Sequence, residues 1–472
     1  MLKNVQYKWL VAIAFVAGFF MDLMDVTIVN VAIPTLSKDF NVPDTTIEWV
    51  VTGYLLSLAI WIPTSGWIGD RFGTKRTFLF ALGVFTVSSV LCSAAPTVQL
   101  LIAFRVLQGI GGGMLTPVGA AMLFRAFPPN ERARASSILS IAAAAAPAIG
   151  PTLGGYLTDF VSWRWIFLVN APIGVATFLF SLMVLKEHRE SDAGRFDFVG
   201  FLISAAGLVL LLYAFSSVPT HGPRSLVVII PGFAGLALLI ALVLVESRMK
   251  KPILPFALFR DRLFKTANAV MFFAFAMWIG FLFVLPLFLQ QYLGLSAYQS
   301  GLTTSPQAIG WLAMATVASR LYKRLKPRKM ITIGLFGATA MTALFVLFGK
   351  SIGLWAISGV LFLRGLSMAF AVIPVQAAAF TNISPVQTGR ASSFFNTNRQ
   401  VASSFGVAVL GAVLFELLLA RPAGQTDQLL AYHVAFALAA GLGLFGILFA
   451  TTIRDEDAAA SLTKEEARVV RR

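Results

Sequence analysis

Two aspartates three residues apart lie inside an apolar stretch that is long enough to cross a membrane. In FFMDLMDVTIVN (residues 19–30), Asp22 and Asp25 stand among Phe, Met, Leu and Val side chains. The surrounding segment, residues 9–34, exceeds the roughly 20 apolar residues that a helix needs to span a bilayer. Because a carboxylate at that depth costs about 2.5–3.5 kcal/mol to insert, we expect these two residues to have a function.

That function is predicted to be proton binding. On one helix the two carboxylates are separated by about 4.5 Å of rise and lie on neighbouring faces. We expect them to share protons and to titrate as a coupled unit. One charge moved through 100 mV supplies about 2.3 kcal/mol, enough for roughly a 50-fold gradient of an exchanged cargo per proton. Two aspartates could also hold a sodium ion, so sodium coupling stays open.

An arginine in another apolar segment is the predicted partner of these acids. Arg105 lies inside residues 98–123, and its guanidinium cannot shed its proton, so it needs an anion nearby. Only Asp22 and Asp25, among 21 acidic residues, lie well inside a predicted helix. Asp25 is therefore the predicted partner of Arg105. The secondary candidates for functional charged residues are Glu416, Arg364 and Arg399. We expect the two arginines to be structural.

The composition is that of a membrane protein. Of 472 residues, 58% are hydrophobic and 12% are charged, and the mean hydropathy is +0.81. Soluble proteins carry about 25% charged residues. Fourteen apolar segments between residues 10 and 452 predict an all-α polytopic protein. The single cysteine, Cys92, excludes an internal disulfide, and three histidines argue against a histidine-based metal centre. We expect no cofactor and no metal.

The net charge of +16 is predicted to orient the protein. Most Lys and Arg residues fall in alternate connecting segments, which is the positive-inside pattern with both termini in the cytoplasm. Nucleic-acid binding is therefore not expected. The start MLKNVQYKWLVAIAF lacks a small-residue cleavage site, so we expect an uncleaved first helix. The predicted location is the plasma (inner) membrane of a bacterium.

The two ends of the chain resemble each other. ERARASSILS (131–140) matches QTGRASSFFN (387–396) in the run Arg-Ala-Ser-Ser, and Gly150 corresponds to Gly406 at the same offset. Many secondary transporters consist of repeated halves with the substrate site between them. The predicted organisation is two pseudo-symmetric six-helix bundles and two inserted helices, with the divisions 1–185, 186–265 (the inserted pair), 266–452 and a cytoplasmic tail, 453–472.

Five motifs in order give these helices a family resemblance. They are LMDVTIVNVAIP (23–34), GWIGDRFGTKR (66–76), RVLQGIGGG (105–113), APAIGPTLGGYL (146–157) and WRWIFLVNAPIG (163–174). This set resembles the major facilitator superfamily, in particular its fourteen-span drug/proton antiporter branch. The resemblance implies multidrug efflux by alternating access, and thus antibiotic resistance.

The resemblance also implies roles for particular residues. Asp70 and Arg71 help to latch the two halves together, and from the residues alone we expect Asp70 to pair with Arg71 or with a helix N-terminus. The whole implied latch is Gly69, Asp70, Arg71, Gly73 and Arg76. A bent helix that seals the pathway in antiporters is implied by Pro147, Gly150, Pro151, Gly154 and Gly155.

The cargo is expected to be hydrophobic, and a cationic cargo stays open. The chain has 42 phenylalanines and 13 methionines, most of which face lipid or pack helices. Residues beside the acids or Arg105 are the better candidates for a substrate cavity, namely Phe19, Phe20, Met24, Asn30, Gln108 and Met114. The expected partners are small hydrophobic or amphiphilic substrates, protons and membrane lipids, and the expected functional unit is a monomer.

Three other functions compete with drug export. A lipid or an endogenous biosynthetic product could be exported on the same fold, and greasy cavities with acids suit both. A sensor or scaffold without transport is disfavoured by the intact Asp25, Arg105 and Gly150-Pro151. An enzyme is disfavoured because no nucleophile–base set or metal cluster lies at one membrane depth.

Overall fold

The structure, a computed structural model, describes residues 6–42, 44–190, 196–246, 256–295, 297–384, 387–419, 425–454 and 456. Within these ranges the chain is helical and has no β-strand. The α-helices are α1 (Tyr7–Phe40), α2 (Asp44–Phe72), α3 (Thr74–Ser93), α4 (Val98–Ala126), α5 (Arg132–Phe160), α6 (Trp165–Leu168), α7 (Asn170–Val184), α8 (Phe198–His221), α9 (Leu226–Glu246), α10 (Arg262–Leu287), α11 (Ala297–Arg324), α12 (Pro327–Ala343), α13 (Leu354–Ala379), α14 (Thr388–Leu419) and α15 (Gln425–Thr451). The short 3₁₀ or π segments are η2 (Pro129–Glu131), η3 (Phe256–Arg260), η4 (Phe288–Tyr292) and η5 (Leu344–Leu347).

Twelve helical stretches of the described chain are long and apolar enough to cross a membrane. The prediction of an all-α polytopic membrane protein is therefore confirmed. The predicted spans near 135–158 and 299–319 correspond to α5 and α11, of 29 and 28 residues, which are less apolar because of their Ser, Thr, Gln and Gly residues. The number of fourteen spans stays a prediction.

Several helices begin where a side chain satisfies the first free backbone amides. Asp197 Oδ1 accepts a hydrogen bond from the amide of Gly200 at 2.8 Å at the start of α8. Asp261 Oδ1 accepts one from the amide of Phe264 at 2.7 Å at the start of α10. Each such cap is worth about 1 kcal/mol. These acids therefore fix where both membrane helices begin.

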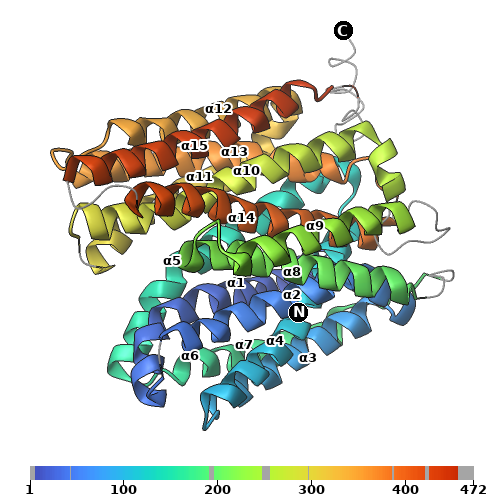
Figure 1. The fold of residues 1–472 in the computed structure, drawn as a ribbon. Coiled ribbons are helices and arrows are strands. Elements are labelled where there is room, and N and C mark those ends of the chain that lie inside the picture. Colours follow the sequence, from blue (N-terminus) through green and yellow to red (C-terminus); the bar gives the residue numbers. More distant parts are fainter. Residues whose placement is uncertain are drawn as a thin grey trace.

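The helices form two bundles with the same internal packing. In the first half, α1 packs on α5, α2 on α4, and α3 on both α4 and α7. In the second half, α10 packs on α14, α11 on α13, and α12 on both α13 and α15. Figure 1 shows the blue-to-teal half below and the yellow-to-red half above. The first helix of each half thus pairs with the fifth, as expected of a repeat.

Two matched glycines sit at equivalent helix crossings. A Cβ on Gly150 of α5 would lie 2.2 Å from Thr27 Oγ1 on α1. A Cβ on Gly406 of α14 would lie 2.0 Å from the carbonyl oxygen of Ala276 on α10. Real Cβ atoms do not approach other atoms this closely, so both crossings require glycine. The sequence match between the two positions therefore corresponds to one shared packing contact.

The helices α8 and α9 lie against both halves. They pack on each other, and α8 also packs on α2 of the first half and α14 of the second. In Figure 1 this pair, in green, runs along one side where the two bundles meet. Leu208 and Leu212 of α8 are buried there against Ala59 of α2. The exact division of the chain at residues 185, 265 and 452 stays a prediction.

The glycine crossing gives a stability prediction with a matched control. Gly406→Ala should lower the melting temperature of the purified protein, because overpacking at a tight contact costs about 1–3 kcal/mol. Gly441→Ala in α15 should leave it unchanged or raise it, because nothing lies within 4 Å of the added Cβ and alanine favours the helix. Thermal unfolding in detergent measures both. Equal effects of the two substitutions would contradict the packing assignment.

Candidate functional site

Asp25 and Arg105 form an ion pair at the centre of the first half. Both side chains are fully buried, and the guanidinium donates to the Asp25 carboxylate. Gln108 Nε2 and Asn170 Nδ2 each donate to Asp25 Oδ1 at 3.0 Å. Gln108 Oε1 in turn accepts from Arg105 Nη1 at 2.7 Å. Helices α1, α4 and α7 are therefore joined by one charged hydrogen-bond network.

The arginine is held from its other side by α2. Arg105 Nε donates to the carbonyl of Val50 at 3.0 Å, and the ring centroid of Tyr54 lies 4.2 Å from the guanidinium carbon. Removing one partner of a buried ion pair costs about 3–5 kcal/mol, because the other charge is left without compensation. A proton that neutralises Asp25 has the same electrostatic effect on Arg105. The contacts of Arg105 with α2 and α4 therefore depend on the negative charge of Asp25 on α1.

Asp22 has a separate set of partners. The Tyr54 hydroxyl donates to Asp22 Oδ1, and Thr116 Oγ1 donates to Asp22 Oδ2 at 2.8 Å. Tyr54 thus bonds Asp22 through its hydroxyl while its ring lies on Arg105. The structure connects the two aspartates through this tyrosine and not by direct contact. Their coupled titration stays a prediction.

Sequence reasoning missed several members of this network. Asn170 lies in the motif WRWIFLVNAPIG, so a signal for it was available. Tyr54 and Thr116 are two of several polar residues in α2 and α4, and no pattern in the sequence distinguishes them. Ser89 Oγ accepts hydrogen bonds from Asn170 and Gln108 at 3.1 and 3.3 Å.

A cavity lies between the two halves beside this network. We call it the central cavity, and it is lined by Phe15, Phe19, Thr116, Ala120, Phe124, Leu139, Ala143, Met271, Phe275, Trp311, Val372, Gln376, Phe380, Ser392, Phe395, Asn396 and Arg399. These residues come from α1, α4 and α5 of the first half and from the segment 271–399 of the second. Thr116 belongs to both the cavity wall and the Asp22 site. The cavity is mainly aromatic and aliphatic, with a few polar groups.

The residues predicted to line a cavity are distributed differently. Phe19 lines the central cavity. Gln108 instead hydrogen-bonds to Asp25 and Arg105. The side chain of Asn30 lies outside the described part of the structure. The remaining three are not among the residues that line this cavity: Phe20, Met24 and Met114.

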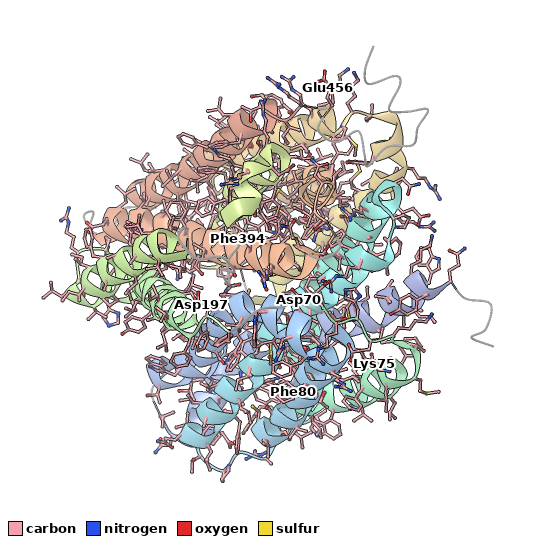
Figure 2. All side chains as sticks on the ribbon, turned by 90° about the vertical axis from the view of Figure 1, so that its right-hand side faces the viewer. Asp70, Lys75, Phe80, Asp197, Phe394 and Glu456 are labelled. Atoms are coloured by element: carbon pink, nitrogen blue, oxygen red, sulfur yellow. The ribbon has the colours of Figure 1, made fainter. Side chains whose placement is uncertain are left out.

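Asp70 connects the two halves at one end of the molecule. It is buried, and its Oδ1 lies 3.1 Å from Arg125 Nη2 of α4. Its Oδ2 lies 3.9 Å from Arg390 Nε of α14. Figure 2 places Asp70 on the blue half at its border with the orange helix that carries Phe394. Asp70 therefore links α2 to α4 and across the interface to α14.

Of the two partners expected for Asp70, Arg71 is wrong, whereas a helix N-terminus does lie beside it: a Cβ on Gly389, in the first turn of α14, would lie 3.0 Å from Asp70 Oδ1. Helix α2 continues to Phe72, so the adjacent residues Asp70 and Arg71 point to different faces and Arg71 is exposed. The true partners, Arg125 and Arg390, are distant in the chain. No sequence pattern marks Arg125, whereas Arg390 is the arginine of the second Arg-Ala-Ser-Ser run.

The same repeat supplies hydroxyl contacts across the interface. Ser393 Oγ lies 2.6 Å from Ser65 Oγ and accepts from the amide of Gly66 at 2.9 Å. Ser392 Oγ donates to the carbonyl of Pro117 at 2.8 Å. Ser392 also lines the central cavity. The halves are therefore in close contact at this end of the cavity.

The loop after α2 is held by the segment that follows α7. Glu187 accepts from the amides of Lys75 and Arg76 at 3.0 and 3.2 Å, at the N-terminus of α3. Gly73 has a φ of 102°, and a Cβ there would meet the Glu187 carboxylate. The amide of Glu190 donates to the Asp70 carbonyl at 3.0 Å. Residues 187–190 therefore hold the turn between α2 and α3 and the last turn of α2, which carries Asp70.

The predicted antiporter helix packs on α1 at the residues that follow Asp25. α5 runs as one helix through residues 147–155, and a Cβ on Gly154 would lie 2.7 Å from Ile28 Cγ1 of α1. Gly150 meets Thr27 of the same helix. Gly155 lies one residue further along α5. The side chains of Pro147 and Pro151 lie outside the described part of the structure.

The secondary candidates lie at three different places. Glu416 Oε1 is 3.8 Å from Arg224 of the α8–α9 connection, and its side chain is 40% exposed. Arg364 is fully buried, donates to Thr342 and Gln307 at 2.8 and 3.1 Å, and lies over the ring of Phe281. Arg399 lines the central cavity.

The second half therefore has no copy of the Asp25–Arg105 pair. Arg364 is the counterpart of Arg105 in the repeat. Since Thr27 and Ala276 occupy equivalent crossings, the position matching Asp25 on α10 is Ala274, which has no charge. Amide and hydroxyl oxygens serve Arg364 instead. Among the described residues, no group of three or more His, Cys, Asp or Glu side chains could hold a metal ion.

Comparisons with known proteins agree with this architecture. A family model described as the Major Facilitator Superfamily matches residues 15–407. The chain is 37% identical over 395 residues to the multidrug resistance protein B homolog of Mycobacterium tuberculosis, covering 83% of this chain and 73% of the relative. It is 29% identical over 412 residues to the MFS-type transporter YhcA of Bacillus subtilis, covering 87% and 77%.

A solved structure gives the same result for the fold. The human organic anion transporter MFSD10 superposes with a TM-score of 0.68 at 16% identity, covering 94% of this chain and 99% of that one. The chain belongs to the Major Facilitator Superfamily. The resemblance drawn from the five motifs is confirmed at this level. The protein is thus a multi-pass membrane transporter with bacterial relatives, and not an enzyme.

The Asp70 site gives a kinetic prediction. Asp70→Asn should slow transport several-fold while substrate affinity stays within a few-fold, because the residue lies at the interface and not in the central cavity. Arg390→Gln should have the same effect, since it removes the partner across the interface. Glu456→Gln, an exposed acid visible in Figure 2, is the matched control and should behave as wild type. Transport rates and equilibrium binding in reconstituted vesicles separate the two quantities. Equal losses of binding and turnover in Asp70→Asn would contradict the latch role.

Proposed function

We propose that the chain is a proton-coupled exporter of hydrophobic drugs or similar small molecules. The observation that carries this proposal is the buried Asp25–Arg105 pair, a titratable carboxylate with its cation beside a cavity between two repeated halves. An acid inside a membrane helix is expensive and is usually functional. A static salt bridge would serve packing less well than apolar side chains of similar size.

Proton binding at Asp25 gives a direct link to conformation. A protonated Asp25 no longer compensates Arg105, so the guanidinium must rely on Gln108, the Val50 carbonyl and the Tyr54 ring. The balance of contacts among α1, α2 and α4 changes as a result. The cytoplasmic end is proposed to open and close through the Asp70–Arg390 contact. Antiport follows if cargo and proton favour opposite states of these contacts.

The cargo assignment rests on the cavity and on the relatives. The central cavity has aromatic walls from both halves, which suit a flat or greasy molecule. A relative that is 37% identical is named as a multidrug resistance protein homolog. We propose the inner membrane of a bacterium as the location, with both termini in the cytoplasm and a monomer as the working unit. No cofactor is needed, because the proton gradient supplies the free energy.

The decisive variant is Asp25→Asn. It should abolish efflux driven by a pH gradient, because it removes the titrating group and leaves Arg105 without its counter-ion. Asp22→Asn should reduce efflux of a neutral substrate much less, since Asp22 does not contact Arg105. The measurement is uptake of hydrophobic dyes and antibiotics into inverted vesicles across a range of pH.

One result of the vesicle experiment would contradict the proposed role of Asp25. If Asp25→Asn retains full pH-driven transport, the coupling residue lies elsewhere and the buried pair is structural. Expression and thermal stability of the variant serve as controls, since loss of a buried charge partner also destabilises the fold. Absence of any transport by the wild-type protein would leave the sensor or scaffold as the better function.

A further inference from the structure

The central cavity has one charged residue in its wall. Among the described residues that line it, Arg399 of α14 alone carries a charge. Its guanidinium carbon lies 6.0 Å from the ring centroid of Phe19 and 5.7 Å from that of Phe275. One ring belongs to each half of the protein. Any cargo between the halves therefore meets a cation beside two aromatic faces.

This cation has no acidic partner within contact distance. Among the described residues, no carboxylate lies within 4.0 Å of Arg399, whereas Arg105 is paired with Asp25 and Arg390 approaches Asp70. The two rings supply only weak compensation, since cation–π attraction falls off near 6 Å. A guanidinium in an apolar wall keeps its charge and is costly without an anion. The site is therefore electrostatically incomplete.

The nearest acidic influence comes from Asp22, but its oxygens are already engaged. Asp22 acts electrostatically on Arg399. Its two oxygens accept hydrogen bonds from Tyr54 and Thr116, and Thr116 stands in the cavity wall. Asp22 therefore weakens the positive field of Arg399 without bonding to it.

We propose that Arg399 binds an acidic group of the cargo, and that the transported molecules are anionic amphiphiles. A carboxylate or phosphate of the cargo would neutralise the guanidinium charge through charge-assisted hydrogen bonds. The apolar body of the cargo would then lie against Phe19 and Phe275. Gln376 and Asn396 line the same cavity and offer amide groups for further polar contacts. This inference rests on the proposed exporter function and names the charge of its cargo.

The direction of charge movement agrees with export. An anion leaving the cell and a proton entering it both move positive charge inward, so the membrane potential drives both steps. The coupling stays with Asp25, which lies outside the cavity wall. Asp22 has a different role, because it sets how strongly Arg399 attracts the anion.

A matched pair of ligands tests this assignment in the purified full-length protein. Dansyl-aminoundecanoic acid and its carboxamide share one apolar body and differ in charge, and their fluorescence reports binding without a pH gradient. Arg399→Gln should weaken binding of the acid by at least about 10-fold and leave the amide within about twofold. Arg399→Lys should retain part of the preference. Arg262→Gln, an arginine of the same half that bonds the Thr452 carbonyl, is the control.

The variant Asp22→Asn is a second test, and it should change the affinity for the acid in the opposite direction. It removes the charge that weakens the field of Arg399, so the acid should bind more tightly than to wild type while the amide is unaffected. Equal losses of acid and amide in Arg399→Gln, or a wild type that does not prefer the acid, would overturn the proposal. A wild type that binds tetraphenylphosphonium better than the acid would also overturn it.

The lipid composition of the membrane distinguishes between two sources of an anionic cargo. In nanodiscs of phosphatidylglycerol, weaker binding of the dansyl acid than in phosphatidylcholine would show that an acidic lipid competes for Arg399. Equal binding in both would identify soluble acids as the ligands. Because binding is measured at equilibrium, a failure of proton coupling in vesicles would not alter these results. The cargo charge and the exporter function are therefore tested independently.

Discussion

The rest of the structure depends on one buried charge pair in a medium without water. Arg105 cannot lose its proton, and inside a bilayer it cannot be hydrated, so an anion must accompany it. Asp25 supplies that anion, and Gln108 and Asn170 hold its carboxylate in place. These contacts join α1, α4 and α7 more specifically than apolar packing would. Because one partner is a carboxylate, we propose that protonation of this pair couples it to transport.

The two halves share an architecture but not a charge distribution. Matched glycines bring α5 against α1 and α14 against α10, so the repeat preserves the helix crossings. Charge is distributed differently, because the carboxylates lie in α1 while α14 presents Arg399 to the cavity. The first half therefore carries the proposed proton site, and the second half carries the proposed cargo site. Exchange between them requires both halves to act on one cavity.

The sequence predicted the helical membrane architecture and the main ion pair for simple physical reasons. Apolar segments of sufficient length have few alternatives to a membrane helix. Arg105 has few acids to choose from, so Asp25 could be identified without coordinates. The family followed from five motifs in order, and Asn170 could have been found in the last of them.

The remaining contacts depend on three-dimensional packing. Asp70 finds Arg390 across the interface between the halves, and adjacent positions in α2 gave the wrong partner, Arg71. Tyr54 is one of several polar residues in α2, and only the fold shows that it connects Asp22 to Arg105. The cavity wall likewise gathers residues from both halves. The residues next to the aspartates in the sequence therefore included the cavity residue Phe19 but not the cavity residue Arg399.

The most direct measurement is proton release on cargo binding. Purified protein in weakly buffered detergent solution is mixed with a substrate that the vesicle assay identifies, and a pH indicator records the protons released. Because linkage is reciprocal, a cargo that competes with protons must displace them. The account predicts release of up to one proton per bound cargo by the wild type and none by Asp25→Asn. Equal release by both proteins would contradict the assignment of coupling to the Asp25–Arg105 pair.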